Sequence, residues 1–179
     1  MQAPHIDPRP DGIGHAIGDK KPVIPRRQRS FDWNEDEVKK LFEDYNGAID
    51  EEEYFLGLIV VAQKEGGPSE VVDGQQRLAT TTILLAAIRD YLIESDPKIA
   101  QSIESQYLMS FDIDEEKNKA HLRLNVEDDP FFSDGVLSRP EATDRKKSKS
   151  GNPIAPQNRA GGGSSKRVCT KDSCRSFAK

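Results

Sequence analysis

The stretch Val71–Thr81 reads VVDGQQRLATT and joins a predicted strand to a predicted helix. Two β-branched residues end an extended segment, and Leu78 begins a long apolar pattern of helical character. A simple connection between a strand and a helix needs only a turn residue and a helix cap. Gln75, Gln76 and Arg77 exceed that need, so this junction is the first candidate for a functional site.

Two interpretations of the junction remain open. Asp73 is predicted to cap the long helix, and Gln76 would complete a capping box three residues later. The functional interpretation is an anion site. Gly74 would let another group approach the backbone, and the first N–H groups of the helix favour an anion. The guanidinium of Arg77 suits phosphate oxygens. The alternative is structural: Asp73 and Gln76 only cap the helix, and Arg77 pairs with an acidic residue. Gln75 adds nothing to such a cap, which slightly favours the functional interpretation.

A second polar cluster lies in PRRQRSFDW, residues 25–33. The functional interpretation brings Gln28 and Arg29 to the same pocket as the helix start, and the alternative is a solvated basic loop. Nearby acidic residues are interpreted first as charges that favour a helix N-terminus, and only second as metal ligands: Asp32, Glu35 and Asp36.

Local patterns predict further helices and strands around these clusters. An Asn34–Glu37 capping box begins an amphipathic helix that ends at Asn46–Gly47. The other predicted elements, in chain order, are a short extended piece at 23–24, a buried strand at 54–61, its antiparallel partner ending at 71–74, a long helix at 75–93, a helix from 96–97 onward and a half-exposed strand at 121–126.

Charge and composition divide the chain of 179 residues, whose length favours one domain with extensions. Residues 1–18 are predicted to be a flexible arm. Residues 139–179 carry 11 of the 26 Lys and Arg but only 3 of the 31 Asp and Glu, so the rest of the chain is strongly acidic. The composition predicts a disordered basic tail, in preference to a specific nucleic-acid-binding arm.

Several classes of protein are disfavoured by the composition. Cys169 and Cys174 are the only cysteines, which argues against a disulfide scaffold and a zinc site. No apolar run approaches the length of a membrane span, and the N-terminus lacks the apolar core of a signal peptide. We therefore expect a cytoplasmic protein that does not bind membranes.

Four motifs occur in a fixed order: IPRRQRSFDW, EYFLGLIV, VVDGQQRLATTTILLAAIRDYL and HLRLNVEDDPFF. Together they resemble the N-terminal domain of the GmrSD family of modification-dependent restriction systems, over about residues 20–138. The resemblance implies an α/β (α+β) fold for residues 19–138, similar to ParB and sulfiredoxin, with a small mixed sheet and packed helices. Two positions depart from the family pattern, since Arg27 stands where Tyr is usual and Ala79 where Thr is common.

The resemblance also implies a function, because the Asp-Gly-Gln-Gln-Arg motif of this family is tied to nucleotide binding and hydrolysis that licenses DNA cleavage. The implied cofactors are an NTP of unknown base and Mg²⁺, the latter held by Asp73. The residues carried over are Asp73, Gln76 and Arg77 as catalytic residues, and Gly74, Gln75, Gln28 and Arg29 as nucleotide-binding residues.

The nuclease half of the family is a separate His-Asn-His-type domain, and nothing after Arg139 resembles it. We therefore expect a partner nuclease in trans, contact with nucleotide and DNA, and no DNA cleavage by this chain alone. Three hypotheses follow from the sequence: an NTP-dependent regulatory domain, a binding module for nucleotide or DNA backbone without turnover, and an inactive fragment of a larger restriction protein.

Overall fold

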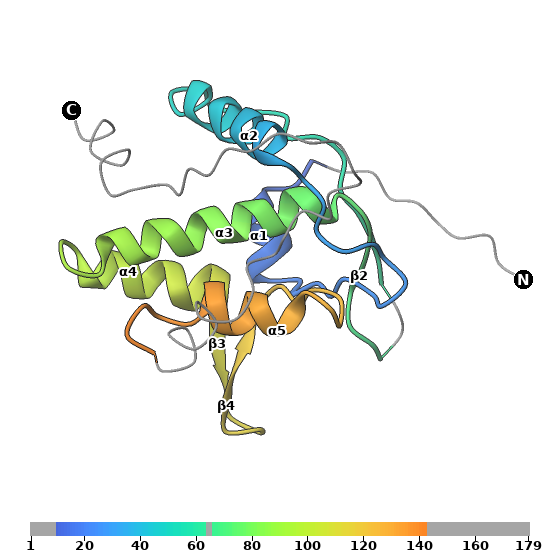
Figure 1. The fold of residues 1–179 in the computed structure, drawn as a ribbon, viewed down its shortest axis with the longest axis vertical. Coiled ribbons are helices and arrows are strands. Elements are labelled where there is room, and N and C mark those ends of the chain that lie inside the picture. The colour runs from blue at the N-terminus through green and yellow to red at the C-terminus, as the bar shows by residue number, and fades with distance from the viewer. Residues whose placement is uncertain (1–9, 64–65, 143–179) are drawn as a thin grey trace, which may run out of the picture.

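The computed structural model describes residues 10–63 and 66–142 and has a mixed α+β architecture, as the sequence predicts (Figure 1). The more specific likeness to ParB and sulfiredoxin stays a prediction. Most of the expected disordered tail, from residue 143 onward, lies outside the described residues, as does the start of the expected N-terminal arm. No described helix combines the length and the apolar character needed to cross a membrane.

The described residues form helices, two π-helical segments (η1 and η2) and two antiparallel strand pairs. In chain order the elements are α1 (Ile13–Gly18), α2 (Glu35–Gly47), β1 (Val60–Ala62), β2 (Glu70–Asp73), α3 (Gln75–Leu92), α4 (Pro97–Ile103), η1 (Glu104–Leu108), β3 (Met109–Asp112), β4 (Lys117–Ala120), α5 (Asp129–Phe131) and η2 (Phe132–Leu137).

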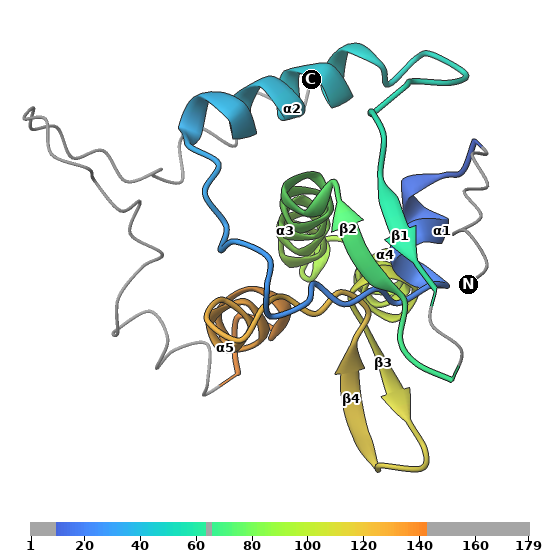
Figure 2. The ribbon, with the colours of Figure 1, turned by 90° about the vertical axis from the view of Figure 1, so that its right-hand side faces the viewer.

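Helix α3 is the centre of the fold, and its predicted extent is confirmed to within a residue. Helix α4 lies beside it, and α2 lies on another side of α3 from the β3–β4 hairpin (Figures 1 and 2). The predicted capping box of α2 is present. The apolar core around α3 comprises Ile17, Ile24, Val71, Leu78, Ala79, Ala86, Leu108, Leu122, Leu124, Phe132 and Leu137.

The extended piece at Val23 connects two parts of the chain that are far apart in sequence. Its N–H donates to the Ser69 carbonyl at 2.8 Å, and its carbonyl accepts from the Val71 N–H at 3.0 Å. The next residue, Ile24, donates to the Arg123 carbonyl at 2.8 Å. These parallel bridges, with the predicted antiparallel pairing of β1 and β2, make a small mixed arrangement next to α3.

The predicted buried strand at 54–61 is wrong in extent and in burial. Regular pairing in this segment begins only at Val60, and Phe55 is 83% exposed and Leu58 62% exposed. The backbone at Gly57 has a φ of 112°, which breaks the extended conformation. The Leu58 carbonyl accepts a hydrogen bond from the Arg77 side chain. The apolar residues of 54–61 therefore belong to a segment that contacts α3 through Arg77, and not to a central strand.

The predicted strand at 121–126 is also wrong. His121 and Leu122 are adjacent and both buried, so the pattern does not alternate between two faces, and only Arg123 makes a single bridge. The strands nearby are β3 and β4, a hairpin that projects from the body (Figure 2). The sequence interpretation missed them because their side chains are mostly polar and the hairpin has little apolar alternation.

The expectation of a flexible arm up to residue 18 is wrong for residues 13–18. They form α1, and the side chain of Ile17 is fully buried in the core. Gly18 lies so close to the next layer that a Cβ there would be 2.6 Å from the Gln106 carbonyl oxygen. The described fold therefore includes α1.

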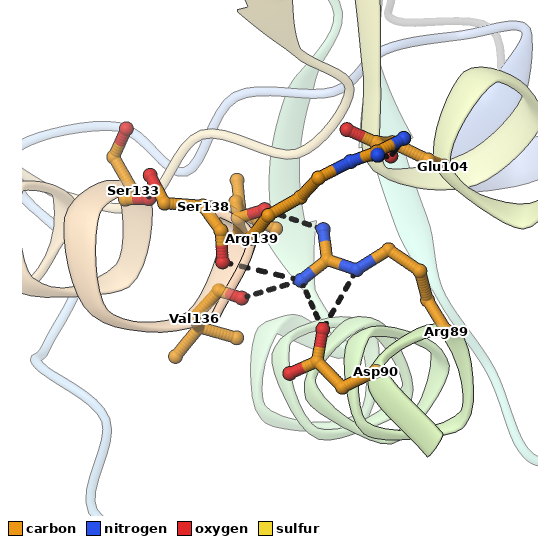
Figure 3. Close-up of polar contacts among 8 residues, drawn as sticks. Arg89, Asp90, Glu104, Ser133, Val136, Ser138 and Arg139 are labelled. Carbon is orange, nitrogen blue, oxygen red and sulfur yellow. Dashed lines mark hydrogen bonds and ion pairs between the residues drawn. The ribbon is translucent and has the colours of Figure 1, made fainter. Parts of the chain in front are cut away.

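A buried arginine joins α3 to the last described helical segment (Figure 3). Arg89 is 0% exposed, and its guanidinium donates to the carbonyls of Val136, Leu137 and Ser138 at 3.3, 2.5 and 3.2 Å. Its charge is balanced by Asp90, whose Oδ1 lies 2.7 Å from Nη2. The final carbonyls of a helix have no partner within the helix, so Arg89 supplies the missing donors at the end of η2.

Candidate functional site

The junction between β2 and α3 differs from its predicted geometry at the cap. Asp73 is the last residue of β2, Gly74 is the residue that precedes the helix, and no side chain caps α3. The predicted Asp73–Gln76 capping box is therefore wrong. The backbone of Asp73 stays extended because it pairs with Val60, whereas Gly74 has a φ of 88°. A Cβ at Gly74 would lie 2.9 Å from the Ile59 side chain, so glycine suits this turn for two reasons.

The two glutamines of the motif hold the preceding loop to the first turn of α3. Gln75 and Gln76 are 9% and 6% exposed. Nε2 of Gln75 donates to the Arg29 carbonyl at 3.3 Å, and Nε2 of Gln76 donates to the Ser30 carbonyl at 3.2 Å. Oε1 of Gln76 accepts from the Asp32 N–H at 3.4 Å. The glutamines therefore satisfy backbone groups of a loop that has no regular partner strand.

Gln28 and Arg29 do reach the junction, as the functional interpretation expected. Nε2 of Gln28 donates to the Val72 carbonyl at 3.0 Å, next to Asp73. Arg29 Nη1 lies 2.8 Å from Asp32 Oδ2, and the Arg29 side chain is 67% exposed. The loop thus carries an exposed guanidinium that pairs with Asp32, and the strand end held by Gln28 carries the exposed carboxylate of Asp73.

Asn125 and Asp128 support the loop from the other side, and the sequence interpretation missed both. Nδ2 of Asn125 lies 3.5 Å from the Gln28 carbonyl and from Ser30 Oγ, and Oδ2 of Asp128 accepts from the Phe31 N–H at 2.8 Å. The available signal is the Asn-Val-Glu-Asp order, because Oδ1 of Asn125 accepts from the N–H groups two and three residues later, the pattern of an Asx turn.

Arg77 joins two of the sequence motifs. Its Nη1 donates to the Leu58 carbonyl at 2.9 Å, and its guanidinium lies against Gly57. A Cβ at Gly57 would be 3.0 Å from Arg77 Cζ. No ion pair between Arg77 and an acidic side chain occurs in the described part of the chain, so the salt-bridge alternative is replaced by a hydrogen bond to the backbone.

The space enclosed at the junction is small. A cavity of about 10 Å³ lies among side chains that include Gln75, Gln76, Phe31 and Asn125. That volume suits roughly one water molecule. Oε1 of Gln75 is buried and has no hydrogen-bond partner among the described residues, which makes it a candidate partner for such a water. A larger ligand does not fit into this cavity. Asp73 and Arg29 are exposed at the surface.

Asp73 is the carboxylate of the motif that could contribute to a metal site. Its carboxylate is exposed, and the described residues provide it with no hydrogen bond or ion pair. Residues 10–63 and 66–142 contain no group of three or more His, Cys, Asp or Glu that suits a metal ion. Mg²⁺ is commonly held by one or two carboxylates together with substrate phosphates. Asp73 therefore fits a Mg²⁺ that arrives with phosphates better than a resident ion.

Comparison with known proteins identifies the family. No curated protein matches the chain. The model of the GmrSD restriction endonuclease N-terminal domain matches residues 13–160, which include α1, the loop, the junction and the supporting Asn125. This match covers most of the chain and agrees with the motifs that the structure brings together. The chain therefore belongs to the family of GmrSD restriction endonuclease N-terminal domains, components of restriction or phage-defence systems.

Proposed function

We propose that this chain is a nucleotide-binding, NTP-hydrolysing regulatory domain of a DNA restriction or phage-defence system. The observation that carries the proposal is the exposed Asp73 carboxylate next to a loop whose backbone is fixed to the junction. Three arginines of this loop are exposed, at positions 26, 27 and 29. Such a surface combines a metal-binding oxygen with cations that suit phosphate groups.

In this proposal the motif residues have separate roles. Asp73 binds Mg²⁺ together with the phosphates, and Arg29 leaves its exposed ion pair with Asp32 to neutralise phosphate charge. The catalytic roles predicted for Gln76 and Arg77 stay predictions. Their observed bonds give them a positioning role, because Gln76 holds the arginine loop and Arg77 holds the segment beside Gly74.

Calorimetric titration of the full chain with each NTP, with and without Mg²⁺, tests the proposal. Asp73→Asn removes the charge and keeps the size, and Asp50→Asn changes an exposed aspartate elsewhere as the matched control. We expect Asp73→Asn to weaken Mg²⁺-dependent binding by at least about tenfold, or about 1.4 kcal/mol. The control should bind like the parent. Equal binding by the parent and Asp73→Asn would contradict the role of Asp73.

Turnover separates the enzyme from a binding module. Release of phosphate from a bound NTP supports hydrolysis, whereas saturable binding without phosphate release favours the second candidate, a domain that binds nucleotide without turnover. The exposed arginines of the loop would also suit a DNA backbone, and such binding would weaken steeply with salt. We expect no DNA cleavage by this chain alone, and plasmid nicking that Asp73→Asn abolishes would overturn that expectation.

A further inference from the structure

The loop of residues 28–32, which carries Arg29, lies between the start of α3 and the turn of residues 125–129 that leads into α5 (Figure 2). The glutamines of α3 hold one side of the loop, and the turn holds the other. Asp128 of the turn lines the small cavity at the junction together with Arg29. The turn is therefore next to the proposed site, although neither the motif nor the proposed function uses it.

Asp128 makes the stronger contact from the turn to the backbone of the loop. Its Oδ2 accepts from the Phe31 N–H at 2.8 Å, whereas Asn125 Nδ2 lies 3.5 Å from the Gln28 carbonyl. A hydrogen bond to a carboxylate is shorter than one between neutral groups and about twice as strong. Phe31 follows Arg29 by two residues, so Asp128 restrains the backbone close to the point from which the arginine side chain projects.

The turn that carries Asp128 is itself held by hydrogen bonds. Asn125 is 4% exposed, and its Oδ1 accepts from the N–H groups of Glu127 and Asp128 at 3.1 and 3.0 Å. Oδ1 of Asp129 accepts from the Leu124 N–H at 2.8 Å, and Leu124 belongs to the apolar core. The carboxylate of Asp128 therefore projects from a turn that is fixed to the core.

Arg29 combines a held backbone with an exposed side chain. Its carbonyl accepts from Gln75 Nε2 at 3.3 Å, while its guanidinium pairs with Asp32 at 2.8 Å and is 67% exposed as a side chain. An exposed ion pair contributes little free energy, so another anion can replace Asp32 at small cost. A backbone that is ordered before the ligand arrives lowers the entropy cost of binding.

We propose that Asp128 is a positioning residue for Arg29 in the proposed nucleotide site. Its carboxylate holds the Phe31 N–H, and through it the backbone of the loop, so that Arg29 meets the phosphates from a loop that is already ordered. In this role Asp128 touches neither the phosphates nor the metal. The inference rests on the proposed function, because it assigns a role at that same site to a residue outside the motif.

An electrostatic role and a positioning role of Asp128 predict opposite changes of affinity. A carboxylate near a phosphate site repels the phosphates, so its removal would by itself strengthen nucleotide binding. Loss of a positioning contact weakens binding, because the loop then has to be ordered when the nucleotide binds. Asn lacks the charge but keeps an oxygen that can accept from the Phe31 N–H, whereas Ala lacks both. Asp128→Asn and Asp128→Ala therefore separate the two roles.

Asp129 provides a matched control in the same turn. The Asp128 and Asp129 residues are both half-buried, and each carboxylate accepts from one backbone N–H at 2.8 Å. The bond of Asp129 ends on the neighbouring Leu124, whereas the bond of Asp128 crosses to the arginine loop. We expect Asp128→Ala and Asp129→Ala to lower the thermal midpoint by similar amounts, so a difference in affinity between them does not come from stability.

Calorimetric titration of the full chain and these variants with each NTP and Mg²⁺, well below their thermal midpoints, tests the proposal. We expect Asp128→Ala to weaken binding at least about tenfold, or about 1.4 kcal/mol. Asp128→Asn should bind like the parent or more tightly, and Asp129→Ala should bind like the parent. Parental affinity in Asp128→Ala would overturn the proposal, as would equal weakening in Asp128→Ala and either of the other two variants.

Hydrogen exchange of backbone amides in the nucleotide-free protein gives a second readout. The Phe31 amide should exchange faster in Asp128→Ala than in the parent, and at nearly the parental rate in Asp128→Asn and Asp129→Ala. An unchanged Phe31 rate in Asp128→Ala would overturn the proposal even where nucleotide binds. If the parent itself binds no NTP, the proposed function fails, and the role of Asp128 at that site fails with it even when the Phe31 amide responds as expected.

Discussion

Helix α3 carries an arginine near each end, and the two are held very differently. Arg77, inside the family motif, is half-buried and donates to one backbone carbonyl, that of Leu58. Arg89, outside the motif, is fully buried and donates to three carbonyls and to Asp90 (Figure 3). Arg77, the arginine of the sequence motif, therefore has fewer hydrogen-bond partners than Arg89.

The difference shows how burial determines what an arginine contributes to the fold. Removing a fully buried charge leaves its partners unsatisfied in a medium where that is costly. Removing a half-buried guanidinium lets water take its place at the Leu58 carbonyl. We therefore expect Arg89 to matter mainly for stability, and Arg77 mainly for the position of the segment beside the junction.

The largest expected effect is at Arg89. Arg89→Met should reduce the free energy of unfolding by about 3–5 kcal/mol, because Asp90 and three carbonyls lose their common donor. Urea unfolding measures the change. Arg139→Met is the control, since Arg139 pairs with Glu104 but is 50% exposed, and it should cost at most about 1 kcal/mol. Equal losses of unfolding free energy in Arg89→Met and Arg139→Met would contradict the view that burial determines the contribution of an arginine.

The next effect is at Gln76, which bonds the loop through both ends of its amide. Gln76→Leu should cost about 1–3 kcal/mol, because the Ser30 carbonyl and the Asp32 N–H lose their partner in a buried site. Hydrogen exchange at the Asp32 amide should become faster. Gln101→Leu, at an exposed position of α4, is the matched control and should leave that amide unchanged. Unchanged exchange in Gln76→Leu would show that other contacts hold the loop.

A smaller change is expected for Arg77→Ala, about 1 kcal/mol in the free energy of unfolding, from one hydrogen bond to a carbonyl. The comparison of the two arginines would be sharpened by measuring Arg77→Ala and Arg89→Met in the same urea titrations. If Arg77→Ala unfolds as readily as Arg89→Met, the half-buried arginine is as important to the fold as the buried one.

The smallest expected effect is a pH dependence from His121, whose side chain is buried. Its pKa lies below the ordinary value of 6.5, so the unfolded chain binds a proton at higher pH than the folded chain. Stability from this group is therefore present above pH 6.5 and falls as the pH drops below it. His121→Gln should flatten that part of a stability–pH profile. Identical slopes in the parent and the variant would contradict the expectation.

The sequence predicted elements well where local signals and burial agree. The Asn34–Glu37 capping box and the Pro97 start of α4 depend on neighbouring residues, and both are present. The errors occur where contacts between distant residues decide. The apolar segment around Phe55 and Leu58 does not pair in the sheet, because Gly57 and the Leu58 carbonyl contact the side chain of Arg77. The β3–β4 hairpin is too polar to be predicted from a pattern of apolar residues.

The sequence predicted where the site lies in the chain, but not the contacts of its side chains. It predicted that Gln28 and Arg29 lie at the junction between β2 and α3, and both contact it. It assigned a cap to Asp73 because the Asp-Gly-Gln-Gln spacing fits a capping box, but pairing with Val60 keeps Asp73 in the strand. The bonds from Gln75 and Gln76 end on carbonyls 46 residues earlier in the chain, a distance that no local pattern reveals.

Helix α1 has a practical consequence for anyone who shortens this protein. A version that begins at residue 19 would lack Ile17, which is fully buried in the core, and would uncover the face of η1 against which Gly14 and Gly18 lie. Freshly uncovered apolar surface promotes self-association. Poor solubility of such a shortened version would then reflect the cut itself, and an assay of its activity would say little about the parent protein.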